Sequence, residues 1–240
     1  MINGLRVLAV VPARGGSKGI PMKNLRTVQG RPLVSIAAEA AKMVPEIDRR
    51  VVSTDHLEIA EVAKSAGLDA PFMRPPEISG DRIGDWDVLV HALREVEVTD
   101  GVTYDIVVML QPTSPLRRQS DVSGTIRMLV DGGYDAVWSV SESDSKAHPL
   151  KQLVIHDGEM DYWDPRGSQI VARQQLEPVY HKNGVAYAIT RSCLIDQGTI
   201  KGRRTGAYVV SGENISIDTE SDIEMVEFLL NRDRKQRGLQ

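Results

Sequence analysis

Short apolar runs alternate along the chain with longer stretches in which apolar residues recur at helical spacing. The runs, bounded by turn residues, predict strands buried on both faces at residues 5–13, 49–55, 105–114 and 135–142. Helical spacing between them predicts amphipathic helices at residues 31–44, 56–67, 87–97 and 121–133. Strands that alternate with helices of this length are typical of right-handed crossovers and a mainly parallel sheet. The pattern therefore predicts an α/β fold, a three-layer α/β/α Rossmann-like sandwich.

The alternation stops at residues 143–180, where prolines, glycines and polar residues interrupt short apolar pieces. We expect an inserted hairpin or arm in this segment. It contains Tyr162 and Trp163 among charged residues, a composition that cannot form a core of its own. Because a second copy of the chain would stabilise such an arm, we expect a homodimer held by it.

Beyond the arm, strand character returns at residues 184–191 and 206–211. Residues 219–237 predict a closing amphipathic helix, with Thr219 as its N-terminal cap and acidic residues in its first turn. The sequence contains no internal repeat and no low-complexity linker. Residues 1–240 are therefore expected to form a single domain that includes the arm.

The composition limits the classes of function. Hydrophobic residues make up 41% of the 240 positions and charged residues 26%, and no apolar run approaches the roughly 20 residues that span a bilayer. A net charge of −4 argues against nucleic acid as a general partner. The single cysteine, Cys193, cannot form an internal disulfide, which fits a reducing cytoplasm. We therefore expect a cytoplasmic protein with neither a membrane nor a nucleic acid as partner.

The first predicted strand leads directly into a glycine-rich, basic loop, VVPARGGSKGIPMKN at residues 10–24. Main-chain N–H groups of such a loop can wrap a polyanion, while Arg14 and Lys18 supply positive charge. The spacing is neither that of a P-loop nor that of the dinucleotide-binding motif G-x-G-x-x-G. On the residues alone, an anion site and an ordinary basic turn both remain open.

Two further polar loops follow predicted strands, at residues 53–55 and 111–115. In an open parallel sheet, ligands bind beyond the carboxyl ends of the strands. We therefore expect these loops to converge with the first loop, residues 12–24, on one crevice. Residues 53–55 have a second interpretation, capping of the following helix, which we favour.

Together the polar segments form a specific pattern. In order along the chain they read PARGGSKGIPMKNL, VVSTD, RPPEI, HAL, LQPTSPLR, HPLK, RQQL, NG and SIDTESD. In order and approximate spacing these motifs resemble those of the acylneuraminate cytidylyltransferases, the CMP-sialic acid synthetases, over nearly the whole chain. The resemblance implies an Mg²⁺-dependent nucleotidyltransferase sandwich that joins CTP to a 2-keto sugar acid and releases pyrophosphate. The G-G-S-K-G run separates the chain from CMP-Kdo synthetases, whose equivalent loop lacks it.

For the nucleotide, the resemblance assigns the first loop and one later arginine. Arg14 and Lys18 match the family's basic pair on the triphosphate, where they stabilise charge during attack on the α-phosphorus. Arg74 matches an arginine that contacts base or ribose. Asn24 matches a residue that touches the nucleotide or the attacking group, with a turn-capping asparagine as the alternative. The remaining nucleotide-binding positions of the loop are Gly15, Gly16 and Ser17.

For the acceptor, the resemblance assigns the Q-P-T-S-P segment and basic motifs of the arm. An amide and two hydroxyls between stiffening prolines suit a sugar carboxylate and its hydroxyls. The substrate-binding residues of this segment are Gln111, Thr113 and Ser114. Those of the arm are Lys151, Arg173 and Gln174, and from there they can reach the site of a partner subunit.

The chain departs from the family's pattern at two positions. Asp85 stands where the family usually has Ser or Thr, and its carboxylate can accept from the amino group of cytosine, from the N–H edge of guanine, or from the next helix as its cap. The late D-x-D motif has Ser216 in its first acidic place. Asp218 is therefore the one residue of this motif that we assign to Mg²⁺ and to catalysis, assisted through water or by Asp222.

The leading hypothesis is a cytidylyltransferase that makes a CMP-sugar from CTP and a sialic-acid-like sugar acid. One alternative is a sister nucleotidyltransferase for a legionaminic-type acid or a phosphonate, with CTP or another nucleoside triphosphate. A second alternative is a nucleotide-binding module without catalysis, because the acidic residue is missing at position 216.

Overall fold

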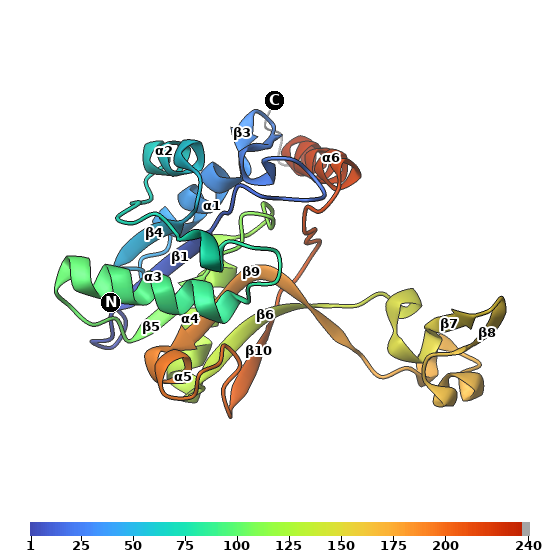
Figure 1. The fold of residues 1–240 in the computed structure, drawn as a ribbon. Coiled ribbons are helices and arrows are strands. Elements are labelled where there is room, and N and C mark those ends of the chain that lie inside the picture. The colour runs from blue at the N-terminus through green and yellow to red at the C-terminus, as the bar shows by residue number, and fades with distance from the viewer. Residues whose placement is uncertain (237–240) are drawn as a thin grey trace.

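Six strands form the central sheet, in the order β10-β6-β9-β5-β1-β4. The computed structural model describes residues 1–236, and in it these strands are β1 (Val7–Pro12), β4 (Arg49–Ser53), β5 (Ile106–Met109), β6 (Ala136–Glu142), β9 (Tyr180–Thr190) and β10 (Thr205–Val209). All neighbours pair in parallel except β9, which is antiparallel to both β5 and β6. The predicted, mainly parallel sheet is confirmed (Figure 1).

Helices cover both faces of this sheet. They are α1 (Leu33–Lys42), α2 (Leu57–Ser65), α3 (Asp85–Asp100), α4 (Gln119–Gly132), α5 (Arg191–Ile195) and α6 (Glu220–Gln236). Strand β1 shows how the layers are filled, because Val7, Ala9 and Val11 pack with α1, α2 and α4. The alternate side chains Leu8 and Val10 pack with α3 and α5 on the opposite face. The three-layer sandwich is therefore confirmed.

Helix ends agree with the predicted signals. Pro32 immediately precedes α1, and Gly67, with a φ of 101°, follows the end of α2. At the start of α6 the hydroxyl of Thr219 accepts a hydrogen bond from the main-chain N–H of Asp222 at 3.3 Å, so the predicted cap is confirmed. Residue 237, the last of the predicted helix, lies outside the described residues. Within residues 1–236, no helix has both the length and the apolar composition to cross a membrane.

The order of the strands creates a crevice. From β1 the chain passes through α1 to β4 on one side, whereas from β5 it passes through α4 to β6 on the other side. Loops that leave neighbouring strands in opposite directions open a crevice beyond the carboxyl ends of those strands. The loops after β1 and β5 are the first and third of the predicted polar loops.

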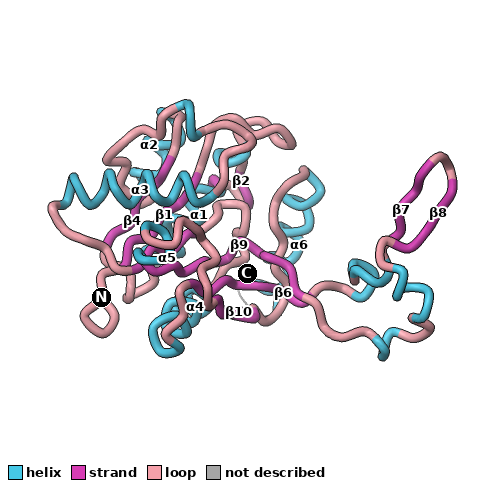
Figure 2. The backbone as a smooth tube through the Cα atoms, turned by 60° about the horizontal axis from the view of Figure 1, so that its bottom comes forward, coloured by secondary structure: helices cyan, strands magenta, loops and turns pink. Residues whose placement is uncertain are grey.

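Residues 143–179 leave the sandwich between β6 and β9 and project far from it (Figures 1 and 2). This arm carries the hairpin of β7 (Leu153–His156) and β8 (Glu159–Tyr162), and a smaller hairpin of β2 (Thr27–Val28) and β3 (Arg31–Pro32) lies elsewhere in the chain. An isolated two-stranded hairpin is marginally stable in water. In addition, the arm exposes large apolar side chains to solvent, namely Leu153, Ile155, Met160, Tyr162, Trp163 and Val171.

Candidate active site

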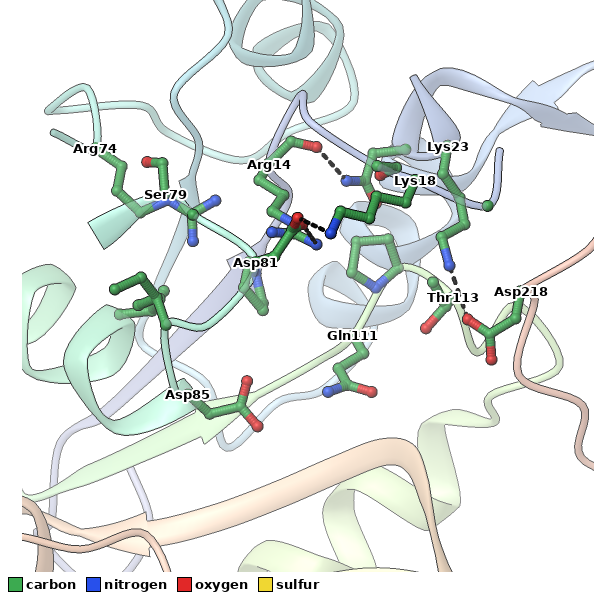
Figure 3. A pocket seen from close by; sticks show the side chains of 18 of the residues that line it. Arg14, Lys18, Lys23, Arg74, Ser79, Asp81, Asp85, Gln111, Thr113 and Asp218 are labelled. Atoms are coloured by element: carbon green, nitrogen blue, oxygen red, sulfur yellow. Dashed lines mark hydrogen bonds and ion pairs between the residues drawn. The ribbon is translucent and has the colours of Figure 1, made fainter. Parts of the chain in front are cut away.

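A cleft of about 550 Å³ lies beyond the carboxyl ends of β1 and β5 (Figure 3). Its walls come from the loops after these two strands, the segment that precedes α3 and the segment that precedes α6. The first and third polar loops therefore converge as predicted. The site residues predicted from the sequence that line the cleft are Arg14, Ser17, Lys18, Asn24, Arg74, Asp85, Gln111, Thr113 and Asp218.

One carboxylate bridges Arg14 and Lys18, two of the three cations of the first loop. Asp81 lies 2.8 Å from Arg14 Nη2 through one oxygen and 2.6 Å from Lys18 Nζ through the other (Figure 3). The hydrogen bond from Lys18 is the main reason that the pKa of Asp81 lies below its usual value. Sequence reasoning missed Asp81, because an aspartate in an exposed loop is not distinctive. At this end of the cleft, Arg14 and Lys18 therefore both face an anionic side chain of the same chain.

Two side chains hold the first loop from behind. Asp55 Oδ1 accepts from the main-chain N–H of Gly15 at 2.9 Å, and Asn24 Nδ2 donates to the carbonyl of Arg14 at 2.9 Å. The favoured interpretation of residues 53–55 as a helix cap is therefore wrong, since α2 has His56 at its N-cap position. Asp55 instead supports the loop, and Gly15 and Gly16 are not among the residues that line the cleft.

The loop also touches the segment that precedes α6. A Cβ atom on Gly19 would lie 2.7 Å from the carbonyl oxygen of Asp218, so only glycine fits there. Lys23 Nζ donates to the carbonyl of Ile217 at 3.0 Å and to Asp218 Oδ1 at 2.8 Å. These contacts place the Asp218 carboxylate at the edge of the cleft beside the basic loop (Figure 3).

Arg74 is the most deeply buried cation of the cleft. It is 5% exposed, and within residues 1–236 its Nε and Nη2 atoms have no hydrogen-bond partner. Burial lowers the pKa of this guanidinium. Buried polar groups are nearly always hydrogen-bonded in native proteins, so these N–H groups indicate a place for acceptor atoms of a ligand.

Asp85 faces the cleft from the first residue of α3, across from Gln111 (Figure 3). The N-cap of α3 is Gly84 and no side chain caps the helix, so the capping interpretation of Asp85 is wrong. Burial raises the pKa of Asp85, while the positive charge of Lys182 acts in the opposite direction. A ligand that donates a hydrogen bond to this carboxylate would offset its desolvation.

The predicted acceptor residues divide into three groups. Gln111 and Thr113 line the cleft, whereas Ser114 is fully buried behind it and donates to the carbonyl of Asn183 at 2.7 Å. The structure therefore gives Ser114 a supporting position and not one at the cleft surface. The remaining predicted residues lie on the arm, outside the cleft lining of the same chain: Lys151, Arg173 and Gln174.

Asp222 is engaged in local structure. Its Oδ2 atom accepts from the main-chain N–H groups of Asp218 at 2.9 Å and Thr219 at 2.7 Å, which forms a capping box at the start of α6. A direct role for Asp222 beside a metal ion is not supported by this arrangement. The hydroxyl of Ser216 instead faces that of Thr113 at 3.5 Å.

A family model described as "Cytidylyltransferase" matches residues 8–237. The chain belongs to the cytidylyltransferase family. The CMP-N,N'-diacetyllegionaminic acid synthase of Legionella pneumophila is 30% identical to it, over 94% of this chain and 97% of the relative. The N-acylneuraminate cytidylyltransferase of Escherichia coli is 26% identical, over 97% of this chain and 54% of the relative.

A solved structure supports the fold of this cytidylyltransferase. The CMP:2-keto-3-deoxy-manno-octonic acid synthetase in complex with CTP aligns with a TM-score of 0.67, over 95% of this chain and 99% of that one, at 21% identity. The resemblance stated from the sequence motifs is confirmed. Family membership identifies an enzyme that uses CTP, and it gives no support to the alternative of a module without catalysis.

Proposed function

We propose that this cytidylyltransferase joins CTP to a nonulosonic acid, a sialic-acid-like 2-keto sugar acid, and forms a CMP-sugar and pyrophosphate. The observation that supports this proposal is the set of cationic and amide side chains that line one cleft. The cations Arg14 and Lys18 lie there, with Arg74 on one wall and Gln111 on the other. Within residues 1–236 the Nε and Nη2 atoms of Arg74 have no hydrogen-bond partner. Two relatives in the same family are named for diacetyllegionaminic acid and acylneuraminic acid, which supports an acceptor of this class.

In this reaction the anomeric hydroxyl oxygen of the sugar acid attacks the α-phosphorus of CTP. A new P–O bond forms, the bond between the α-phosphorus and the bridging oxygen breaks, and its electron pair leaves with pyrophosphate while the hydroxyl proton passes to water. Arg14 and Lys18 stabilise the negative charge of the triphosphate and of the leaving group. Arg74 donates to base or ribose, and Gln111 orients the acceptor.

Asp218 is the residue we assign to Mg²⁺. Within residues 1–236 there is no group of three or more His, Cys, Asp or Glu side chains that could hold a metal ion. Mg²⁺ needs no such group, since it commonly binds one or two carboxylates together with substrate phosphates. The Asp218 side chain is 72% exposed and lies beside the basic loop, which fits this mode of binding. When bound, the ion neutralises phosphate charge.

A pyrophosphate-release assay with Mg²⁺ tests the proposal. The four nucleoside triphosphates are each combined with sialic, legionaminic and Kdo-type acids and with a phosphonate acceptor. We expect release with CTP and a nonulosonic acid. Release with GTP would assign Asp85 to guanine recognition, release with the phosphonate alone would identify the sister enzyme, and no release with any combination would contradict the proposed function.

The Asp81 bridge leads to a prediction about nucleotide affinity. In Asp81→Asn the cations no longer face a competing carboxylate, so we expect KM for CTP to fall about threefold to tenfold. The low pKa of Asp81 means that the competing charge is present throughout the neutral range. KM is measured at low and high salt, with Glu77→Gln, an exposed acid of the same segment, as the control. A higher KM in Asp81→Asn would show that Asp81 supports nucleotide binding.

We further propose that the arm, residues 143–179, holds a homodimer. Its apolar side chains are exposed in the single chain, and a second copy would cover them. In such a dimer Lys151, Arg173 and Gln174 would reach the acceptor side of the partner's cleft, where basic residues suit a sugar carboxylate.

Mixed dimers test this arrangement. Arg14→Ala and Arg173→Ala chains are co-expressed with different tags and purified as the heterodimer. One of its two sites then combines an intact cleft with an intact arm, so we expect about half the wild-type rate, whereas each parent homodimer is expected to be nearly inactive. The control pairs Arg14→Ala with Lys18→Ala, which leaves both clefts defective. A heterodimer as inactive as its parents would contradict the contribution of the partner's arm.

We propose a cytoplasmic location from the state of Cys193. Within residues 1–236 it is a free cysteine and it is buried. Burial raises its pKa to about 11, so it is a neutral thiol at neutral pH. A lone buried thiol fits a reducing compartment.

A further inference from the structure

Arg117 lies behind the wall of the cleft that carries Gln111, and the proposed reaction assigns it no role. It is 8% exposed, and within residues 1–236 it forms no ion pair with a carboxylate. Burial lowers its pKa to about 9. A buried charge without a counter-ion is costly. Within residues 1–236 its Nη1 atom has no hydrogen-bond partner, so the hydrogen bonds of its Nε and Nη2 atoms are the ones that offset this cost.

The guanidinium of Arg117 donates to three main-chain carbonyls. Its Nη2 atom donates to Gln111 at 2.6 Å and to Gly184 at 3.0 Å, and its Nε atom donates to Val185. Gln111 follows the end of β5, and the other two residues belong to β9. Arg117 therefore fastens the residue that faces the acceptor to the neighbouring antiparallel strand.

The strand β9 is irregular at this point. Its register against β6 shifts between Trp138 and Val140, and Gly184 has a φ of 70°. The side chain of Gln111 packs directly on this glycine, because a Cβ atom there would lie 2.4 Å from Gln111 Oε1. The same Cβ atom would lie 2.8 Å from Ser114 Oγ, whose hydroxyl donates to Asn183.

These contacts determine both the main chain and the side chain of Gln111. Its carbonyl is held by Arg117, its N–H donates to the carbonyl of Gly184 at 3.3 Å, and its carboxamide rests on Gly184 while it faces the cleft (Figure 3). We propose that Arg117 is a positioning residue for the acceptor, which acts by holding Gln111 against the irregular part of β9. The inference rests on the proposed function in that Gln111 is taken to bind the sugar acid.

The test is a kinetic comparison of Arg117→Met, Arg117→Lys and, as the control, Arg118→Met at the exposed neighbouring position. In Arg117→Met we expect KM for the sugar acid to rise and kcat to fall, each about 10-fold or more, because the acceptor is misplaced. KM for CTP should stay within about twofold, because Arg14, Lys18 and Arg74 lie on other walls. Arg117→Lys should recover part of the loss. Equal losses for both substrates would overturn the proposal.

Gly184→Ala disturbs the contact between Gln111 and β9 from the β9 side. It tests the proposal even if Arg117→Met does not fold. The added methyl group pushes against the carboxamide of Gln111, so we expect the same pattern, with KM for the acid affected and KM for CTP preserved. An unchanged KM for the acid and unchanged kcat in Gly184→Ala would overturn the proposal.

Amide hydrogen exchange tests whether Arg117 positions Gln111 without requiring that the enzyme turn over a sugar acid. If the wild-type enzyme shows no turnover with any acceptor, the proposed function fails, and positioning is judged on amide exchange alone. Faster exchange at residues 111–114 in Arg117→Met, with unchanged exchange at residues 14–24, supports the positioning role. Unchanged protection at residues 111–114 overturns it.

Discussion

Replacement of Arg14 by alanine is expected to lower kcat/KM for CTP by about 10²- to 10³-fold, since a charge-assisted contact to the triphosphate and leaving group is lost. Arg14 and Lys18 lie together at the end of the cleft where Asp81 already occupies an anion position. Without the guanidinium, Lys18 is the one cation of this pair that remains to stabilise pyrophosphate as it leaves. Steady-state kinetics with varied CTP measure the loss, and calorimetric titration with CTP separates binding from catalysis.

Two further variants make this result specific. Arg14→Lys keeps the charge but not the two-pronged geometry, so we expect partial activity. Arg82→Ala removes an exposed cation from the loop that carries Asp81 and should leave kcat/KM unchanged. If Arg14→Ala retained the wild-type kcat/KM, the basic loop would not be the triphosphate site.

Asp218→Ala is expected to abolish turnover, with a loss in kcat of about 10³-fold or more, and to leave the fold intact. Its side chain is 72% exposed, so little core packing depends on it. The variant removes the carboxylate assigned to Mg²⁺ and leaves Lys23 without its carboxylate partner. Pyrophosphate release at saturating Mg²⁺ measures activity, and thermal unfolding followed by circular dichroism measures the fold.

Glu220→Ala is the matched control for Asp218→Ala. Glu220 is also an acid near the start of α6, and its exposed side chain pairs with Arg26 at 2.6 Å, away from the cleft lining. We expect this variant to keep wild-type turnover. Activity retained by Asp218→Ala at saturating Mg²⁺ would exclude the metal assignment.

The sandwich could be predicted because its signals are local. An unbroken apolar run such as β1 can only be buried on both faces, and Pro32, Gly67 and Thr219 mark helix ends by their own backbone chemistry. The direction of β9 could not be predicted in this way. A strand's direction depends on the path of the chain before it, and here that path runs through the arm.

The site was predictable to the extent that its residues form contiguous motifs. The first loop and the segment after β5 carry glycines, cations and an amide that are distinctive in sequence. Asp81, Asp55 and Arg117 act through contacts with residues distant in the chain. Asp55 ends the motif VVSTD and Arg117 ends the motif LQPTSPLR, but neither motif shows which residues these side chains contact. The sequence also suggested that Asp55 and Asp85 cap helices, because both lie close to the start of a helix. An aspartate at such a position looks the same in sequence whether it caps the helix or has another role.

The contact between the first loop and the segment before α6 has a consequence for the order in which the enzyme matures on the ribosome. Lys23 and Asp218 are 195 positions apart, and the main chain of Gln29 pairs with Glu227 across 198 positions. All six strands of the central sheet are synthesised before Asp218 emerges. The two core clusters that pack on the faces of the sheet contain no buried residue after Val210, whereas the basic loop acquires its contacts with Ile217 and Asp218 from the segment that is synthesised afterwards.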